Sequence, residues 1–437
     1  MQLTSSTGAT STERSGGSSI LARLNRPVAA GAIAFLGWLA FVVARWHVWA
    51  HGHITLFIMS GVKYSHPDQM SPRISHVPLA GYDGQFYYRF ARNPFNWDPT
   101  AYGITIDHNY RYTRLGYPIV TWLLSLGGQA RLVPTMLVVV NLLCIAAVGW
   151  LGAKFARDSG RHALWGLLLV AYFGLVISVG RDTSEPLADA CMLGGLLAYR
   201  RSRHVLAALL LAYGAITNEP ILAAAVGIAL TRLYQMYKRR AKPGWQDLAW
   251  VLPGAAYVVL EGLEKVLVKG TSGGVSDITQ NITLPFRDMI PWLITDVHRL
   301  NWTHLGLYDY NVIEAIALLV VVVAGLLVLR STTAPVHERV VFVVFVCIEM
   351  VFASSQFWGS VFGDGRTYVE SFMMGIVLLL ATPPAVATAG EAASRGGGVL
   401  PRLLPANRVI TNKRLAWIAA IAVAALLVVA RRRILFQ

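Results

Sequence analysis

The stretch at residues 81–92, GYDGQFYYRFAR, joins one carboxylate to a run of aromatic side chains. Asp-Gly favours a turn, and the aromatic residues that follow recur at the i, i+4 spacing of an amphipathic helix at an interface. Asp83 would stand at the N-terminal end of that helix and face an outer cavity, where a carboxylate is suited to acid–base chemistry. The alternative is that Asp83 only caps the helix and that the aromatic residues form an interfacial belt.

A second polar stretch follows at residues 107–118, DHNYRYTRLGYP. Arg111 and Arg114 are three residues apart, so both guanidinium groups can lie on one face of a turn. This arrangement suits a phosphate or pyrophosphate held at a membrane surface. The alternative is a pair of arginines that snorkel toward lipid headgroups.

The pattern T-x-E-P occurs twice, at residues 183–186 and 217–220. Each copy is predicted to open a helix that runs inward from the outer face, which places Glu185 and Glu219 at outer helix ends. The neighbouring Asp182 enlarges the polar cluster around the first copy. The alternative is capping, because Ser or Asn at the N-cap, an acid in the first turn and an early Pro all favour helix initiation.

A fourth stretch, GDGRTYVE at residues 363–370, places one arginine after a flexible turn. Gly-Asp-Gly allows the backbone to approach a ligand closely. Arg366, at the entrance to the next predicted helix, is then a second candidate for a phosphate contact. The competing interpretation is an ordinary short turn between two helices.

The elements that must position these residues are apolar helices. The chain has 437 residues, of which 55% are hydrophobic and 14% are charged, against about 25% charged residues in soluble domains. At about 20 apolar residues per span, this predicts an all-α polytopic membrane protein with about 11 transmembrane helices. The predicted spans begin near Pro27, Leu132, Ala163, Pro186, Val205, Ile221, Leu248, Asn311, Val340, Tyr368 and Leu415.

The charge distribution predicts how these helices are oriented. Lys and Arg collect in alternate connections, which places the N-terminus in the cytoplasm of a multi-pass plasma-membrane protein. The formal net charge of +15 is then a topology signal, and we expect no nucleic-acid partner. Residues 1–26 form a disordered cytoplasmic tail and 27–437 a single bundle, with long outer loops at about 51–114 and 269–310. Loops of this length are expected to hold juxtamembrane helices.

The acidic residues separate into two groups under this topology. Most lie in outer connections, beside Arg, Tyr and Trp at helix ends, which places any chemistry on the outer face. A few lie within predicted spans: Asp189, Glu261, Glu264, Glu314 and Glu349. Because a charged residue in lipid costs about 2.5–3.5 kcal/mol at the bilayer centre, each intramembrane acid is a functional candidate.

The two motifs at residues 82–89 (YDGQFYYR) and 110–118 (YRYTRLGYP), together with the long first outer loop and the acids at helix tips, resemble the GT-C superfamily. Its members are integral membrane glycosyltransferases that use polyprenyl-phosphate-linked sugars. The motifs are also similar to those of a group of bacterial multi-pass proteins placed with that superfamily. The architecture covers most of the chain, whereas the motif match covers only residues 82–118.

The resemblance implies roles for particular residues. In that superfamily an acid of the first outer loop acts as the general base or otherwise orients the acceptor, and the matching position here is Asp83, with Asp107 second. Basic residues at outer helix ends hold the donor phosphate, which implies Arg366, Arg111 and Arg114. The chain lacks a DxD or paired-acid motif, so no resident metal or other cofactor is expected. The residues expected to line the substrate cavity are Tyr82, Gln85, Tyr87, His108, Asp182, Glu185, Asn218, Glu219 and Asp364.

The function predicted on this basis is transfer of a sugar from a polyprenyl-phosphate-linked donor to an acceptor at the outer face of the membrane. The acceptor, whether glycan, protein or lipid, is left open, as is the sugar. A transporter or lipid flippase is the first alternative, with the intramembrane acids as coupling sites. A non-catalytic subunit that keeps the GT-C-like fold is the second.

Overall fold

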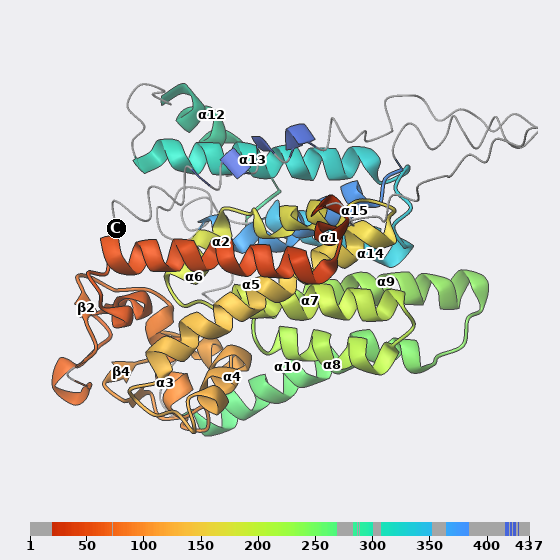
Figure 1. The fold of residues 1–437 in the computed structure, drawn as a ribbon. Helices are drawn as coiled ribbons and strands as arrows, with labels where there is room; N and C mark the ends of the chain where they lie inside the picture. The colour runs from red at the N-terminus through yellow and green to blue at the C-terminus, as the bar shows by residue number, and fades with distance from the viewer. Residues whose placement is uncertain are drawn as a thin grey trace, which may run out of the picture.

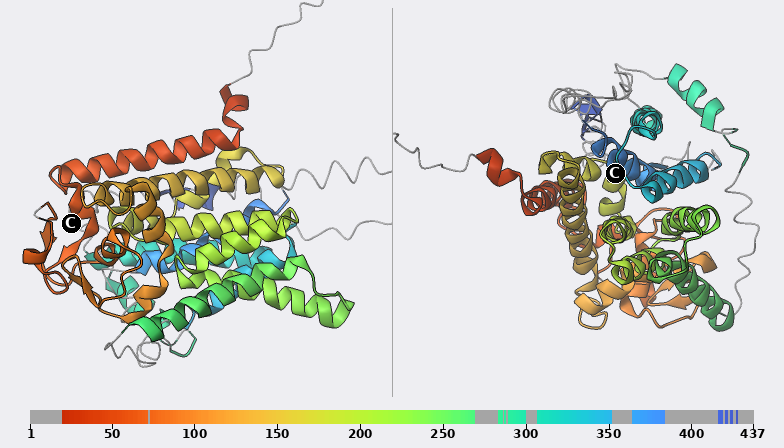
Figure 2. Two further views of the ribbon diagram at one scale, coloured as in Figure 1. Left: turned by 90° about the horizontal axis from the view of Figure 1, so that it is seen from below. Right: turned by 90° about the vertical axis from the view of Figure 1, so that its right-hand side faces the viewer.

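The computed structural model describes residues 20–71, 73–268, 283–285, 287, 289–299, 307–351 and 364–383, together with parts of 416–427. The described residues are mostly helical, with 71% helix and little strand. Its long helices lie side by side in one bundle, and short elements gather at one end of it (Figures 1 and 2). That end is called the site end below.

The first part of the bundle is built on two apolar helices, α2 (Pro27–Val48) and α5 (Val133–Asp158), which pack along each other. They are preceded by the short α1 (Ile20–Leu24), which falls within the tail predicted to be disordered. After α5 come η4 (Ala163–Val170) and α6 (Gly174–Gly180), which meet at a bend of 68°. The break explains why one predicted span is present as two short helices.

The remaining helices complete the bundle around these. They are α7 (Glu185–Arg200), α8 (His204–Ala215), η5 (Glu219–Ile221), α9 (Leu222–Arg239), η6 (Trp245–Asp247), α10 (Leu248–Leu267), α13 (Leu307–Val328), α14 (Val336–Glu349), η8 (Asp364–Tyr368) and α15 (Val369–Leu380). The main core joins α2, α5, α6 and α7 to α13, α14 and α15, so the last helices pack against the first.

Two helices, α2 and α5, are long and apolar enough to cross a membrane, and counting the bent pair η4–α6 as one span makes three. These figures concern the described part of the chain and rest on length and composition. The span predicted near Leu415 lies largely outside the described residues. Each of the other predicted spans begins within four residues of the first residue of a helix. Several are short, however: α8 and α15 have 12 residues each, about 18 Å at 1.5 Å per residue against a hydrocarbon core of about 30 Å. The count of about 11 spans therefore stays a prediction.

The long first connection forms a compact layer at the site end (Figure 1). It contains helices η1 (Ile54–Ile58), η2 (Pro67–Gln69), α3 (Gly84–Arg92) and η3 (Asn109–Thr113), followed by α4 (Gly116–Leu124). Strands β1 (Ser60–Gly61) and β2 (His76–Val77) pair in parallel, with Ser60 opposite His76, and β3 (Thr100–Ala101) pairs antiparallel with β4 (Ile104–Thr105). A second core joins this layer to α5. Short helices, which were expected in this connection, are thus present; their position beside a membrane stays a prediction.

In the second long connection, predicted at 269–310, the structure describes α12 (Met289–Arg299) and the start of α13. Residues 269–282 and 300–306 of that connection lie outside the described part of the chain.

Candidate functional site

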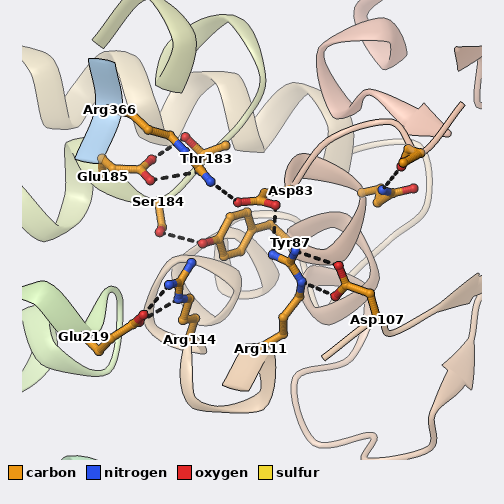
Figure 3. A network of polar contacts seen from close by, with 12 residues as sticks. Asp83, Tyr87, Asp107, Arg111, Arg114, Thr183, Ser184, Glu185, Glu219 and Arg366 are labelled. Carbon is orange, nitrogen blue, oxygen red and sulfur yellow. Dashed lines mark hydrogen bonds and ion pairs between the residues drawn. The ribbon is translucent and has the colours of Figure 1, made fainter. Parts of the chain in front are cut away.

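Asp83 is held between two arginines that come from distant parts of the chain (Figure 3). Its Oδ1 atom lies 2.9 Å from Nη1 of Arg111, and its Oδ2 atom accepts a hydrogen bond from Nη2 of Arg366. Asp83 precedes the first residue of α3, yet its side chain makes no capping hydrogen bond to the helix. The carboxylate, 8% exposed, therefore pairs with cations and does not cap α3.

A glycine contact fixes where α3 begins. A Cβ atom on Gly84 would lie 2.4 Å from the carbonyl oxygen of Arg181 and 2.8 Å from that of Ile58. Only glycine lets the start of α3 approach both the segment before α7 and the end of η1 this closely. This packing brings Asp83 beside the first T-x-E-P segment.

Arg366 joins Asp83 to Glu185. Its Nη1 atom lies 3.1 Å from Oε1 of Glu185, while its Nη2 atom binds Asp83. Arg366 lies on η8, which packs against α6 so tightly that a Cβ on Gly174 would lie 2.0 Å from the carbonyl oxygen of Gly365. One guanidinium is therefore shared by two acids from different segments.

Glu185 is the first residue of α7 and is 4% exposed. Its second carboxylate oxygen accepts a hydrogen bond from Oγ1 of Thr183. Ser184, at the N-cap position, makes no side-chain capping bond, and its hydroxyl lies 2.8 Å from that of Tyr87. The first T-x-E-P copy thus presents its side chains to neighbouring segments.

Asp107 is bound to Arg111 through both carboxylate oxygens. Nη2 of Arg111 donates to Oδ2 of Asp107 at 2.9 Å, and Nε donates to Oδ1. Asp107 was predicted as the second candidate base, but both of its oxygens are occupied by one guanidinium. It is placed to orient Arg111 toward Asp83 (Figure 3).

Arg114 and Glu219 form a separate pair on the other side of Tyr87 (Figure 3). Nε of Arg114 donates to Oε2 of Glu219 at 2.6 Å, and Nη2 binds the other oxygen. Asn218 makes no side-chain capping bond here. In both copies of the repeat, the glutamate therefore pairs with an arginine from another segment, and neither Ser184 nor Asn218 caps through its side chain.

The cations determine the protonation of these carboxylates. Burial alone would raise the pKa of Asp83, but Arg111 and Arg366 outweigh it and hold that pKa well below its usual range. Glu219 shows the same balance: burial opposes its ionisation, and Arg114 nevertheless lowers its pKa. Burial raises the pKa of Tyr87 to about 12. Asp83 and Glu219 are thus held in the charged form beside their arginines, and the Tyr87 phenol is neutral.

The aromatic ring of Tyr82 supports two of the cations. The guanidinium carbon of Arg366 lies 4.9 Å from the ring centroid, and that of Arg181 lies 4.3 Å from it. Such contacts favour a partly desolvated guanidinium. The Tyr82 hydroxyl is buried without a hydrogen-bond partner among the described residues.

Other predicted cavity residues lie in different settings. The Gln85 amide bonds the backbone, accepting from the Gly61 N–H at 3.1 Å and donating to the Ala80 carbonyl at 2.8 Å, so it holds the first connection together. His108 stacks on Tyr110. Asp182 is fully buried, at a positive φ of 50°, and neither carboxylate oxygen has a hydrogen-bond partner in the described part of the chain. Asp364 begins η8, and its side chain lies outside the described residues.

Arg45 contributes to the site and was not predicted from the sequence. It is 1% exposed, its Nε donates to the carbonyl oxygen of Gly180 at 3.1 Å, and its guanidinium carbon lies 4.0 Å from the ring centroid of Trp49. It therefore fixes the end of α6, directly before Arg181. In the sequence it stands at the end of an apolar span beside Trp and His, a pattern typical of an ordinary interfacial anchor.

The site shows no arrangement of ligands for a metal ion. Within the residues that the structure describes, no group of three or more His, Cys, Asp or Glu side chains is placed to hold one. The acids at the site end are separated from one another by arginines (Figure 3).

Comparisons with known proteins were made against family models, curated proteins and solved structures. No family model matches the chain, and neither a curated protein nor a solved structure matches it. The resemblance to the GT-C superfamily therefore rests on the sequence motifs at residues 82–89 and 110–118 and on the architecture predicted from the sequence.

Proposed function

We propose that the protein is a membrane glycosyltransferase of the GT-C type. It would transfer a sugar from a polyprenyl-phosphate-linked donor to an acceptor at the outer face of the plasma membrane. The observation that carries the proposal is the placement of Asp83 between Arg111 and Arg366. A base and two phosphate-binding cations are the groups that such a transfer requires, and here they lie in direct contact.

In the proposed reaction, a hydroxyl oxygen of the acceptor attacks the anomeric carbon of the sugar. The bond between that carbon and the phosphate oxygen breaks, and the polyprenyl phosphate leaves with the bonding electron pair. Asp83 takes the proton of the attacking hydroxyl, a role that typically contributes about 10²–10⁴-fold. Arg366 and Arg111 stabilise the charge that develops on the departing phosphate. A single displacement of this kind inverts the anomeric configuration.

In this proposal, the pairing of Asp83 with Arg111 and Arg366 lets one site supply both the base and the phosphate-binding groups. Two arginines keep Asp83 ionised but lower its pKa, which makes it a weak base. Two oxygens of a donor phosphate can accept two parallel N–H bonds from a guanidinium group, as the two oxygens of a carboxylate do. When the phosphate takes over Arg366 and Arg111, Asp83 loses its cationic partners and its pKa rises toward the range of a useful base. Donor binding would thus activate the base.

The proposal includes the topology. About 11 spans with the N-terminus in the cytoplasm would place the first connection, and with it Asp83, at the outer interface. The phosphate of a lipid-linked donor lies at that depth. The presence of α2 and α5 at either side of this connection supports that placement.

Sugar transfer by the purified full-length protein in proteoliposomes tests this function. The donors are polyprenyl-phosphate-linked hexoses and pentoses, the acceptors are present in an added cell-envelope extract, and the readout is release of polyprenyl phosphate. The parent protein is expected to release it with at least one donor. Asp83→Asn is expected to slow release by about 10²–10⁴-fold.

Asp158→Asn is the matched control, because Asp158 also pairs with an arginine, Arg201, but does so in an exposed position at the end of α5. Its release rate should equal that of the parent. Full activity of Asp83→Asn would remove Asp83 as the base. Equal loss in both variants would show that the effect is not specific to the site.

A transporter is the second candidate, and Asp189 favours it. Asp189 lies on α7, is fully buried and has no hydrogen-bond partner for either carboxylate oxygen among the described residues. Buried acids of this kind serve as coupling sites in transporters. Proton or solute flux into proteoliposomes that Asp189→Asn abolishes would support this function, and its absence would leave the transferase.

A further inference from the structure

A cavity of about 500 Å³ lies at the site end, apart from the Asp83 contacts. Its wall is formed by three short segments: residues 52–55 after α2, residues 73–75 in the first connection, and residues 130–134 at the start of α5. Oγ1 of Thr55 donates to Oγ of Ser75 at 3.0 Å, which ties two of these segments together. The volume falls within the range of about 300–1,000 Å³ typical of small-molecule sites.

The charge of the cavity wall is positive. Arg73 and Arg131 contribute to it and are exposed to solvent. None of the described residues that line the cavity is acidic. Pro134, in the first turn of α5, completes the wall without adding charge. Two guanidinium groups on one cavity wall suit an anion.

The place of the cavity points to the source of that anion. The cavity lies between the C-terminal end of α2 and the N-terminal end of α5. These are the two described helices that are long and apolar enough to cross a membrane by themselves. The ends of such helices meet the lipid headgroups, so the cavity opens at the depth of the headgroup phosphates.

From this cavity we infer a binding site for the phosphate group of an anionic membrane lipid. Arg73 and Arg131 bind the phosphate oxygens, and the acyl chains lie along the apolar surfaces of α2 and α5. The inference shares with the proposed function the placement of α2 and α5 across the membrane. It does not depend on the transferase chemistry, because it rests on other residues.

The cavity is also connected to the Asp83 site by a short helix. Ile54 and Thr55, at the start of η1, line the cavity. Ile58, at its end, lies against Gly84, where a Cβ would be 2.8 Å from the Ile58 carbonyl oxygen. A lipid bound in the cavity would thus brace the segment against which the start of α3 packs.

Native mass spectrometry of the detergent-purified full chain tests the lipid site. The probes are phosphatidylglycerol, which has a net negative headgroup, and phosphatidylcholine, whose headgroup is neutral. We expect one phosphatidylglycerol molecule to bind more tightly than phosphatidylcholine. The double variant Arg73→Gln/Arg131→Gln should bind phosphatidylglycerol about tenfold more weakly, because it loses charge-assisted hydrogen bonds. Arg73→Lys/Arg131→Lys should lose less, because it keeps the charge.

The charge-matched control is Lys238→Gln/Arg239→Gln, at the exposed end of α9. It should bind phosphatidylglycerol like the parent. Equal weakening in the two double variants to Gln, or equal binding of the two lipids by the parent, would overturn the inference. Inorganic phosphate added to the complex separates two sources of the same chemistry. Displacement of the lipid would show that the phosphate group is sufficient for recognition, and retention would show that the acyl chains are also needed.

Discussion

The two ends of α7 carry buried ion pairs of different design. At the C-terminal end of α7, Nε and Nη2 of Arg200 bind the two carboxylate oxygens of Glu338 on α14. The Nε–Oε1 hydrogen bond is 2.8 Å long. At the first residue, Glu185 shares Arg366 with Asp83. We call the first pair closed, because two nitrogens of Arg200 bind both oxygens of the same carboxylate. The second is shared, since one guanidinium divides its nitrogens between two acids.

The helix dipole favours both ends equally, so it does not explain the difference. An acid at the N-terminus of α7 and a cation at its C-terminus are each stabilised by the partial charges of the helix. The difference is in the partners. In the closed pair, both carboxylate oxygens and the two guanidinium nitrogens that face them are already bonded to each other. This arrangement suits a structural contact between α7 and α14. A shared guanidinium can exchange one carboxylate for a phosphate, which suits binding.

Removing the acid at each end should therefore have unequal effects on stability. Glu338→Gln leaves Arg200 without its ionic partner and should lower the free energy of unfolding by about 3–5 kcal/mol. Glu185→Gln should cost less, because Arg366 keeps Asp83. The measurement is unfolding in detergent by sodium dodecyl sulfate, followed by circular dichroism. Equal losses in the two variants would contradict the distinction between closed and shared pairs.

A substitution at Gly84 tests the packing that positions Asp83 at the site end. Gly84→Ala places a methyl group against two carbonyl oxygens, and overpacking of this kind costs about 1–3 kcal/mol. It should lower both the unfolding midpoint and donor binding, because Asp83 is the preceding residue. Gly37→Ala in α2 is the control, since nothing lies within 4 Å of the added Cβ. A midpoint in Gly84→Ala as high as that of Gly37→Ala would show that this contact does not hold the site.

Much of the helical arrangement could be predicted because it follows from local apolar runs. Every predicted span except the one near Leu415 begins within four residues of the first residue of a described helix. Their lengths could not be predicted in the same way. The bend of 68° between η4 and α6, within one continuous apolar run, depends on packing against segments far away in the chain.

The sequence indicates which acids and arginines belong to the site, but it does not indicate which of them pair with each other. Asp83 and Arg366 are 283 residues apart, and no local spacing joins them. The pairing requires the close approach of α6 to η8 at Gly174 and of α3 to the α7 segment at Gly84. Gln85 and Asp107 were expected to face substrate, whereas their side chains are bound to the backbone and to Arg111. Arg45 was missed because it acts through the backbone carbonyl of Gly180.

The most direct test of the shared arrangement is the affinity of Asp83→Asn for polyprenyl monophosphate. This variant removes the carboxylate that competes for Arg111 and Arg366, so the account predicts that binding becomes about tenfold tighter while sugar transfer is lost. A purely structural role for Asp83 would weaken binding and transfer together. Asp158→Asn, measured in parallel on folded protein from size-exclusion chromatography, should change neither. Binding by Asp83→Asn that is unchanged or weaker than that of the parent would contradict the central claim.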